Sequence, residues 1–101
     1  SETPKPATRR FVLTGDRHAA DLDHARLIRQ RLTPGDAVFV VSDCHHDVAP
    51  TLKHKGALVP FLQAALRPGA EAGDLAACLH ASAVASALWR SQGSSDASKS
   101  G

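Results

Sequence analysis

The sequence predicts a small α/β domain, a two-layer or three-layer sandwich with a βαβ core and a short, mainly parallel sheet. Two apolar segments, Phe11–Leu13 and Ala37–Ser42, flank a stretch with helical periodicity. A helix between two buried strands connects them as parallel neighbours. The third observation is the length of 101 residues, which leaves room for one domain only.

The first strand, Phe11–Leu13, ends in a turn, and a helix is predicted after it over Arg17–Leu32 because apolar residues recur there at helical spacing. Asp16 stands where an N-cap is expected. Pro34 ends the helix, since proline cannot continue it. The second strand, Ala37–Ser42, is continuously apolar, as expected when helices cover both faces of a sheet.

The middle of the chain leaves one element open. A short helix is expected over Asp47–Lys55, with Gly56 at its end. Ala57–Leu62 could be a third strand, with Pro60 confining it to a sheet edge or to a strand end. Alternatively, Pro60 begins a helix that runs to Arg67. Periodicity does not distinguish these two alternatives.

A last helix is predicted over Asp74–Arg90, stopped by Gly93. Its segment Leu75–Trp89 has no formal charge and carries many small side chains, which let backbones approach closely. We therefore expect this helix to be covered by the fold or to form a homo-oligomer contact.

Both ends are predicted to be disordered tails. Residues 1–8 hold two prolines and no apolar run, and residues 92–101 are rich in Ser and Gly, so neither segment buries enough surface to offset its ordering entropy. The ordered domain is predicted over residues 9–91. Because the chain starts at Ser1 and has no leader, we expect a domain excised from a larger protein or a processed product.

Composition argues against several classes of protein. A formal net charge of +2 is too small to predict a nucleic-acid or membrane partner. No apolar run reaches the roughly 18 residues that a membrane span needs. The chain has only two cysteines, too few for a disulfide-rich secreted scaffold, and this favours a reducing, cytoplasmic setting.

Polar residues follow both predicted strands where each strand ends. In parallel sheets ligands bind at the carboxyl ends of the strands, so we expect the two polar clusters to lie at one edge. The alternative is that they form only turns and helix caps, which also require Asp and Gly. The candidate ligand-binding residues are Thr14, Gly15, Asp16, Arg17, Asp43, His45 and His46.

Six histidines and two cysteines raise the question of a metal site. The pairs Cys44-x-His46 and Cys78-x-His80 do not fit zinc, because Cys78 and His80 would point in different directions on a helix and the usual zinc-ligand spacings are missing. An oxygen-and-imidazole set across the two turns fits better. A divalent metal is thus the alternative to our expectation of no cofactor, with Asp16, His18, Asp43, His45 and His46 as candidate ligands.

Catalytic and phosphate-binding motifs are incomplete. Cys44 beside two histidines is a candidate nucleophile, but no nucleophile elbow, zinc-protease motif or phosphate loop occurs. Lys53–Lys55, Arg9–Arg10 and Arg17 are candidates for phosphate contacts, although few aromatic residues are present to stack on bases.

The sequence therefore favours a non-catalytic binding or interaction domain of a larger protein or complex. We expect it to hold a small ligand or a protein partner at the edge where the strands end. One alternative is a metal-binding or hydrolytic enzyme domain that uses Asp43–Asp47. The other is a phosphate- or nucleic-acid-binding module.

Overall fold

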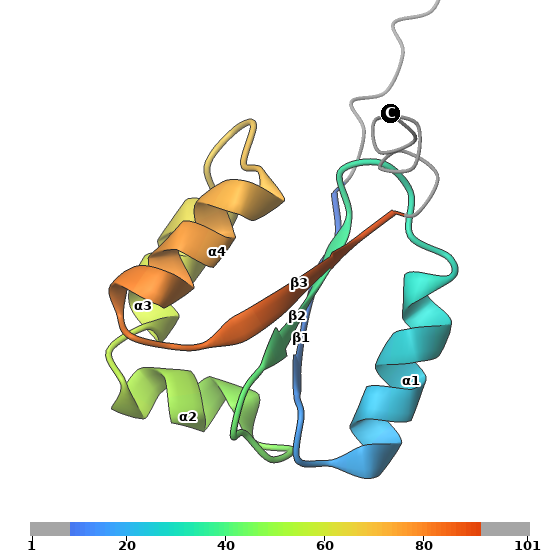
Figure 1. The fold of residues 1–101 in the computed structure, drawn as a ribbon. Coiled ribbons are helices and arrows are strands. Elements are labelled where there is room, and N and C mark those ends of the chain that lie inside the picture. The colour runs from blue at the N-terminus through green and yellow to red at the C-terminus, as the bar shows by residue number, and fades with distance from the viewer. Residues whose placement is uncertain (1–8, 92–101) are drawn as a thin grey trace, which may run out of the picture.

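The computed structural model describes residues 9–91 and confirms the α/β class. Figure 1 shows three layers, with α1 (Ala19–Arg29) on one face of the sheet and three helices on the other, α2 (Val48–His54), α3 (Leu58–Ala65) and α4 (Ala72–Ala81). No described helix is long and apolar enough to cross a membrane. The two predicted tails lie outside the described residues. In chain order the elements are β1 (Phe11–Gly15), α1 (Ala19–Arg29), β2 (Ala37–Val41), α2 (Val48–His54), α3 (Leu58–Ala65), α4 (Ala72–Ala81) and β3 (Ser86–Arg90).

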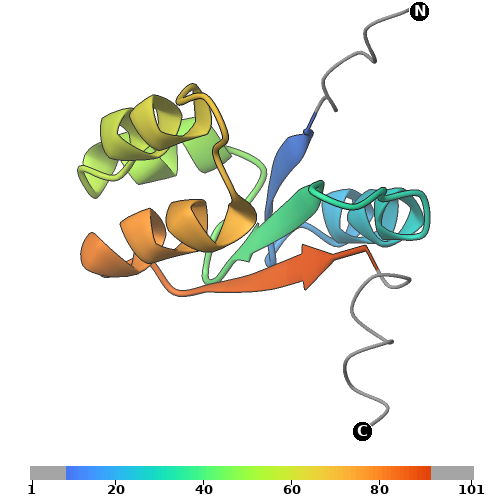
Figure 2. The same cartoon turned by 90° about the horizontal axis from the view of Figure 1, so that it is seen from above.

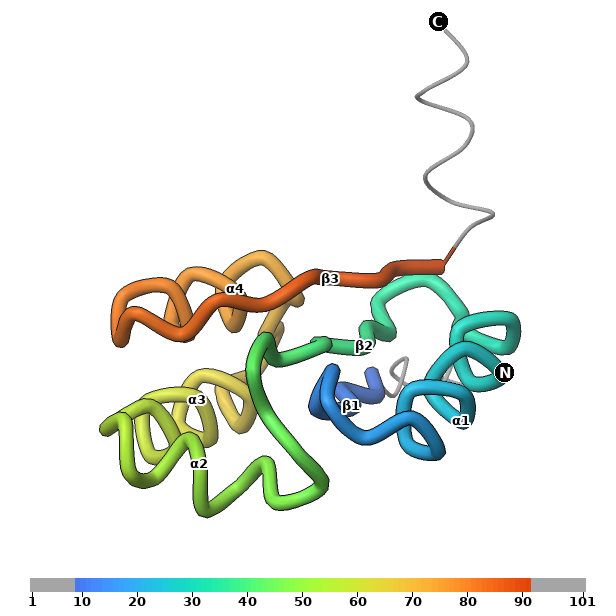
Figure 3. Tube along the Cα trace, turned by 60° about the horizontal axis from the view of Figure 1, so that its bottom comes forward, coloured from blue at the N-terminus to red at the C-terminus, as the bar shows by residue number. Residues whose placement is uncertain are grey.

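The sheet has the strand order β1-β2-β3. β1 pairs with β2 in parallel, with Phe11 opposite Ala37, and this confirms the βαβ core. β3 runs antiparallel on the other side of β2, with Arg90 opposite Ala37. The sheet is thus mixed, with one parallel and one antiparallel pair, and β2 lies between the two edge strands (Figures 2 and 3).

The central strand β2 is buried along its whole length because helices cover both of its faces. Successive side chains of a strand point to opposite faces, so β2 contributes to two cores. Val38 and Val40 pack with Ala25 on the α1 side. Phe39 packs on the other side, where its ring meets the ring of Phe61 from α3 edge-on at 5.4 Å. This arrangement explains the continuous apolar run of β2.

Helix α1 is shorter than the predicted helix over Arg17–Leu32. It begins at Ala19, because His18 takes the N-cap position and its Nδ1 accepts a hydrogen bond from the amide of Asp21. Asp16 is therefore not the cap.

The open element in the middle of the chain is a helix, α3, with Pro60 in its first turn. Proline is tolerated there because the first amides of a helix have no partner within it. A strand over Ala57–Leu62 is therefore wrong. The helix predicted over Asp47–Lys55 is confirmed by α2, and Gly56 follows it with a φ of +74°.

A helix over Asp74–Arg90 is also wrong, because α4 ends at Ala81 and residues 86–90 form β3. The chain turns at Ala83, whose φ is +60°. An oligomer contact through a helix over Leu75–Trp89 therefore loses its basis. Trp89 packs instead against the α1 core, with the guanidinium carbon of Arg29 5.0 Å from its ring centre.

Candidate functional site

The turns after β1 and β2 lie against each other, as the parallel pairing predicts. The carboxylate of Asp16 accepts hydrogen bonds from the amides of Asp43 at 2.8 Å and Cys44 at 3.4 Å. The amide of Arg17 donates to the carbonyl of Cys44 at 2.8 Å. These bonds fix the loop after β2 to the start of α1.

Gly15 allows this close approach. A Cβ at this position would lie 2.2 Å from the carbonyl oxygen of His45 and 2.3 Å from that of Cys44, and both are backbone atoms. Such distances are far inside ordinary contact, so any side chain here would push the loop away. Gly15 therefore helps to set the position of the loop that carries His46.

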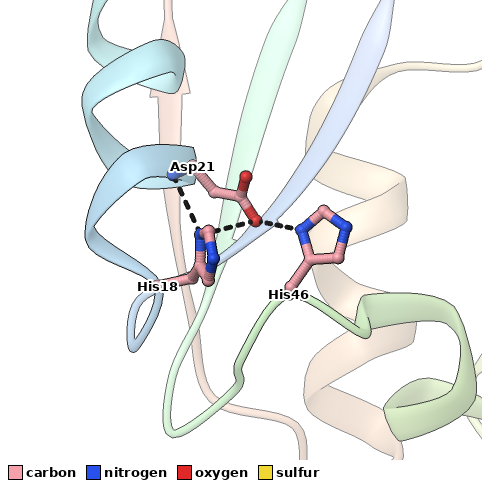
Figure 4. A group of neighbouring side chains, drawn as sticks. All are labelled: His18, Asp21 and His46. Carbon is pink, nitrogen blue, oxygen red and sulfur yellow. Dashed lines mark hydrogen bonds and ion pairs between the residues drawn. The ribbon is translucent and has the colours of Figure 1, made fainter.

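Three side chains converge beside these turns: His18, Asp21 and His46 (Figure 4). We call them the His18–Asp21–His46 cluster. The Oδ2 atom of Asp21 lies 2.6 Å from Nδ1 of His46 and 3.2 Å from Nδ1 of His18. One ligand atom from each residue falls within 4.8 Å of the other two. The cluster thus offers two imidazole nitrogens and a carboxylate oxygen to one point.

Asp21 and His46 alter each other's proton affinity. The hydrogen bond that protonated His46 donates to the Asp21 carboxylate raises the pKa of His46 above its usual value, and the nearby charge of Asp21 adds to the effect. The hydrogen bond with His46 in turn lowers the pKa of Asp21. Both side chains reach solvent, with exposed fractions of 71% for His46 and 29% for Asp21. Protons and other cations therefore have access to this pair.

The Nδ1 atom of His18 lies near two groups of Asp21, the backbone amide and the side-chain carboxylate. This nitrogen accepts from the amide of Asp21 at 3.2 Å, and it also lies 3.2 Å from the Asp21 carboxylate. A ring nitrogen that accepts a hydrogen bond cannot donate one. The single lone pair of Nδ1 is engaged by the Asp21 amide while that bond is made, so a cation at Nδ1 would take the place of this hydrogen bond.

The structure brings together some of the residues predicted for the site, whereas the others make different contacts. His18 and His46 belong to the cluster, but the carboxylate of Asp16 holds the loop amides and that of Asp43 pairs with Arg17. His45 is exposed and lies outside the cluster.

Asp21 is the cluster residue that the sequence analysis missed. It lies three residues after His18, in the first turn of α1, where acidic residues are favoured. A helix that starts at Ala19 places both residues at the same end of α1. The spacing His18-x-x-Asp21 is thus the feature that could have identified this pair.

A hollow of about 170 Å³ opens beside the cluster. Asp21 and His46 line it together with His24, which faces the same space from α1. The rest of its lining is mostly apolar. Thr14 also belongs to this wall, but its hydroxyl is closed off from solvent and has no partner among the described residues. The remaining lining residues are Val12, Leu13, Ala25, Ile28 and Val48.

A larger hollow, of about 240 Å³, lies at the other end of the sheet. Arg9, Arg90 and Glu71 line it, so charges of both signs face the same space. The buried carboxylate of Asp36 lies in its wall, already bonded to Arg10 and Thr33. Among the described residues, no ligand atoms converge at this hollow as they do in the His18–Asp21–His46 cluster.

Cys44, the candidate nucleophile, is buried with 1% of its surface exposed. Its thiol donates to the carbonyl of His45 at 3.4 Å. A substrate has no access to a sulfur in this position, so Cys44 contributes to the core in the manner of a small apolar residue.

Comparison with known proteins gave no matching family model, no similar curated protein and no similar solved structure.

Proposed function

We propose that this domain binds a divalent transition-metal ion through the His18–Asp21–His46 cluster. The observation that carries the proposal is the convergence of two imidazole nitrogens and one carboxylate oxygen within 4.8 Å. Such mixed nitrogen and oxygen ligands suit zinc and its neighbours in the first transition row, whereas magnesium and calcium prefer oxygen alone. The proposal places the metal where the sequence analysis expected a ligand, at the carboxyl ends of β1 and β2.

One of the distances in the cluster already matches that of a tetrahedral zinc site. Metal–nitrogen and metal–oxygen bonds of about 2.0–2.2 Å put neighbouring ligand atoms about 3.3 Å apart in a tetrahedron. The separation of His18 Nδ1 from Asp21 Oδ2 is 3.2 Å. The 2.6 Å contact of His46 has to lengthen by about 0.7 Å to reach that spacing. His46 is largely exposed, which favours this small movement.

Three protein ligands leave at least one position of the metal open. Asp21 and His46 also line the hollow of about 170 Å³, so that position has space for water or a small ligand. We therefore propose a binding role that depends on the metal, and we assign no reaction to it.

The test is a titration with zinc ions at about pH 8, because the raised pKa of His46 calls for a more alkaline solution than an ordinary histidine needs to be neutral, followed by amide NMR shifts and calorimetry. Zinc is expected to shift the amides of His18, Asp21 and His46. His46→Ala should weaken binding about tenfold or more.

The matched control is His45→Ala, which removes the neighbouring exposed imidazole and should bind zinc as the wild type does. Equal affinity in wild type and His46→Ala, or no zinc binding by the wild type, would overturn the proposal. In that case the Asp21–His46 pair only ties the loop to α1.

A further inference from the structure

The larger hollow, of about 240 Å³, is lined by charged side chains that the metal cluster does not use. Arg9 lies just before β1, Arg90 ends β3, and Glu71 lies just before α4. A fourth charged residue, Asp36, also lies in the wall, but it is buried and its carboxylate is occupied by hydrogen bonds from its neighbours. The charges available to a ligand in this hollow are therefore two guanidiniums and one carboxylate.

Contacts place both guanidiniums at the start of α4. Nη1 of Arg9 donates a hydrogen bond to the carbonyl of Ala70. Arg90 reaches the first turn of the helix, since a Cβ at Gly73 would lie 3.5 Å from its Nη2 atom. Ala70 and Gly73 stand on either side of Glu71 in the chain. The three charged side chains of the hollow therefore surround one short segment.

These opposite charges are not paired with one another. Within residues 9–91, neither Arg9, Arg90 nor Glu71 forms an ion pair. Glu71 takes the N-cap position of α4, yet its side chain makes no capping hydrogen bond. A guanidinium has five N–H donors, and Ala70 accepts from only one nitrogen of Arg9. Donors and an acceptor thus remain available to a ligand.

We propose that this hollow binds a small zwitterion of the α-amino acid type. The carboxylate of such a ligand would accept hydrogen bonds from the two guanidiniums, whose planar N–H groups match a carboxylate. Its ammonium group would pair with the carboxylate of Glu71. A simple anion in the hollow would face Glu71, and a simple cation would face both arginines, so each would meet a like charge. A ligand that carries both charges has an opposite charge for each.

The rest of the lining limits the size and polarity of the ligand. Gly35, Ala72 and Ser91 complete the wall, and none of them has a large apolar side chain. The volume of about 240 Å³ is several times the roughly 30 Å³ that one water occupies in the liquid, so a small amino acid has room. We therefore expect amino acids with small or polar side chains rather than aromatic ones.

The experiment compares alanine with two derivatives, N-acetylalanine and alaninamide, by amide NMR shifts at about pH 6.5 and low salt. Alanine carries both charges, whereas N-acetylalanine keeps only the carboxylate and alaninamide only the ammonium. Alanine is expected to shift the amides of Arg9, Glu71 and Arg90, and the derivatives are expected to bind much more weakly. Arg90→Gln should weaken alanine binding about tenfold, because a charge-assisted hydrogen bond is lost.

Glu71→Gln distinguishes a zwitterion site from an anion site. It should weaken the binding of alanine about tenfold and strengthen that of N-acetylalanine, because it removes the charge that attracts an ammonium and repels a lone carboxylate. Arg26→Gln is the matched control, since it changes an exposed arginine of α1 outside the hollow and should leave alanine binding unchanged. The proposal is overturned if alanine does not shift these amides, or if either derivative or inorganic phosphate binds as tightly as alanine. Wild-type affinity for alanine in Glu71→Gln would also overturn it.

Discussion

At the scale of single residues, Asp36 holds together the segment that leads into β2. Its side chain is fully buried and accepts hydrogen bonds from the amides of Arg10 and Thr33 and from the Thr33 hydroxyl. The guanidinium of Arg10 lies 3.0 Å away. Burial by itself raises the pKa of a carboxyl, but these donors outweigh it and lower the pKa of Asp36 to about 2. The charged form is therefore the stabilising one.

This lowered pKa predicts an acid-dependent contribution to stability. Because the folded pKa lies below the ordinary value of 3.8, the contribution is present above pH 3.8 and is lost as the pH falls through about 2. The difference corresponds to about 2 kcal/mol. In urea unfolding, Asp36→Asn should be less stable than wild type by about this amount near pH 6, and the gap should close near pH 2. A gap of the same size at both pH values would contradict the prediction.

The candidate site could be predicted only in part at this scale. The parallel pairing of two strands was enough to bring the two turns together, and with them His18 and His46. The separate roles of the carboxylates could not be predicted, because Asp16, Asp21 and Asp43 are the same residue type and differ only in their structural surroundings. Their assignment to loop amides, cluster and Arg17 depends on where α1 begins.

At the scale of elements, the end of α4 explains the largest error in the sequence-based prediction. The amide of Val84 donates to the carbonyl of Leu79, and the amide of Ala83 donates to that of His80. This is the Schellman motif, in which the residue after the C-cap adopts a left-handed conformation. Glycine is usual at that position, but here it is Ala83, with a φ of +60°. The sequence therefore contains no glycine or proline where α4 ends.

The strand β3 was missed for a related reason. Its sequence, Ser-Ala-Leu-Trp-Arg, holds two residue types with little preference for strands, and its alternation becomes visible only once the helix has ended. Leu88 then packs into one core and Trp89 into the other. By contrast, β2 was predictable because its five buried residues are all apolar.

Ala83→Gly should stabilise the protein. A left-handed conformation costs an L-residue about 1–2 kcal/mol, and glycine avoids this cost but loses more entropy on folding. We expect a net gain of about 0.5–1 kcal/mol, measured by urea unfolding. Ala77→Gly, an exposed position within α4, is the matched control and should lose about 1 kcal/mol. A loss of stability in Ala83→Gly would contradict the left-handed turn.

At the scale of the whole molecule, the cluster joins segments that lead to two different layers, near the carboxyl ends of β1 and β2. His18 and Asp21 belong to the start of α1, which covers one face of the sheet, and His46 lies in the loop that leads to α2, a helix that covers the other face (Figure 1). A metal held by all three residues would therefore link segments that separate when the chain unfolds. Binding of this kind stabilises the folded state, because the unfolded chain does not hold the three ligands together.

Zinc should consequently raise the melting temperature in a concentration-dependent way. At a free concentration of 100 times Kd the gain is about 2.7 kcal/mol, and each kcal/mol raises the Tm of a domain this size by about 4–8 °C. A rise of about 10 °C or more is therefore expected in calorimetry. Asp21→Asn should lose most of it, since the carboxylate is the central ligand, whereas His45→Ala should keep it. Magnesium should have no effect, because it prefers ligands that are all oxygen. An equal rise in Asp21→Asn would show that zinc stabilises the fold from some other place.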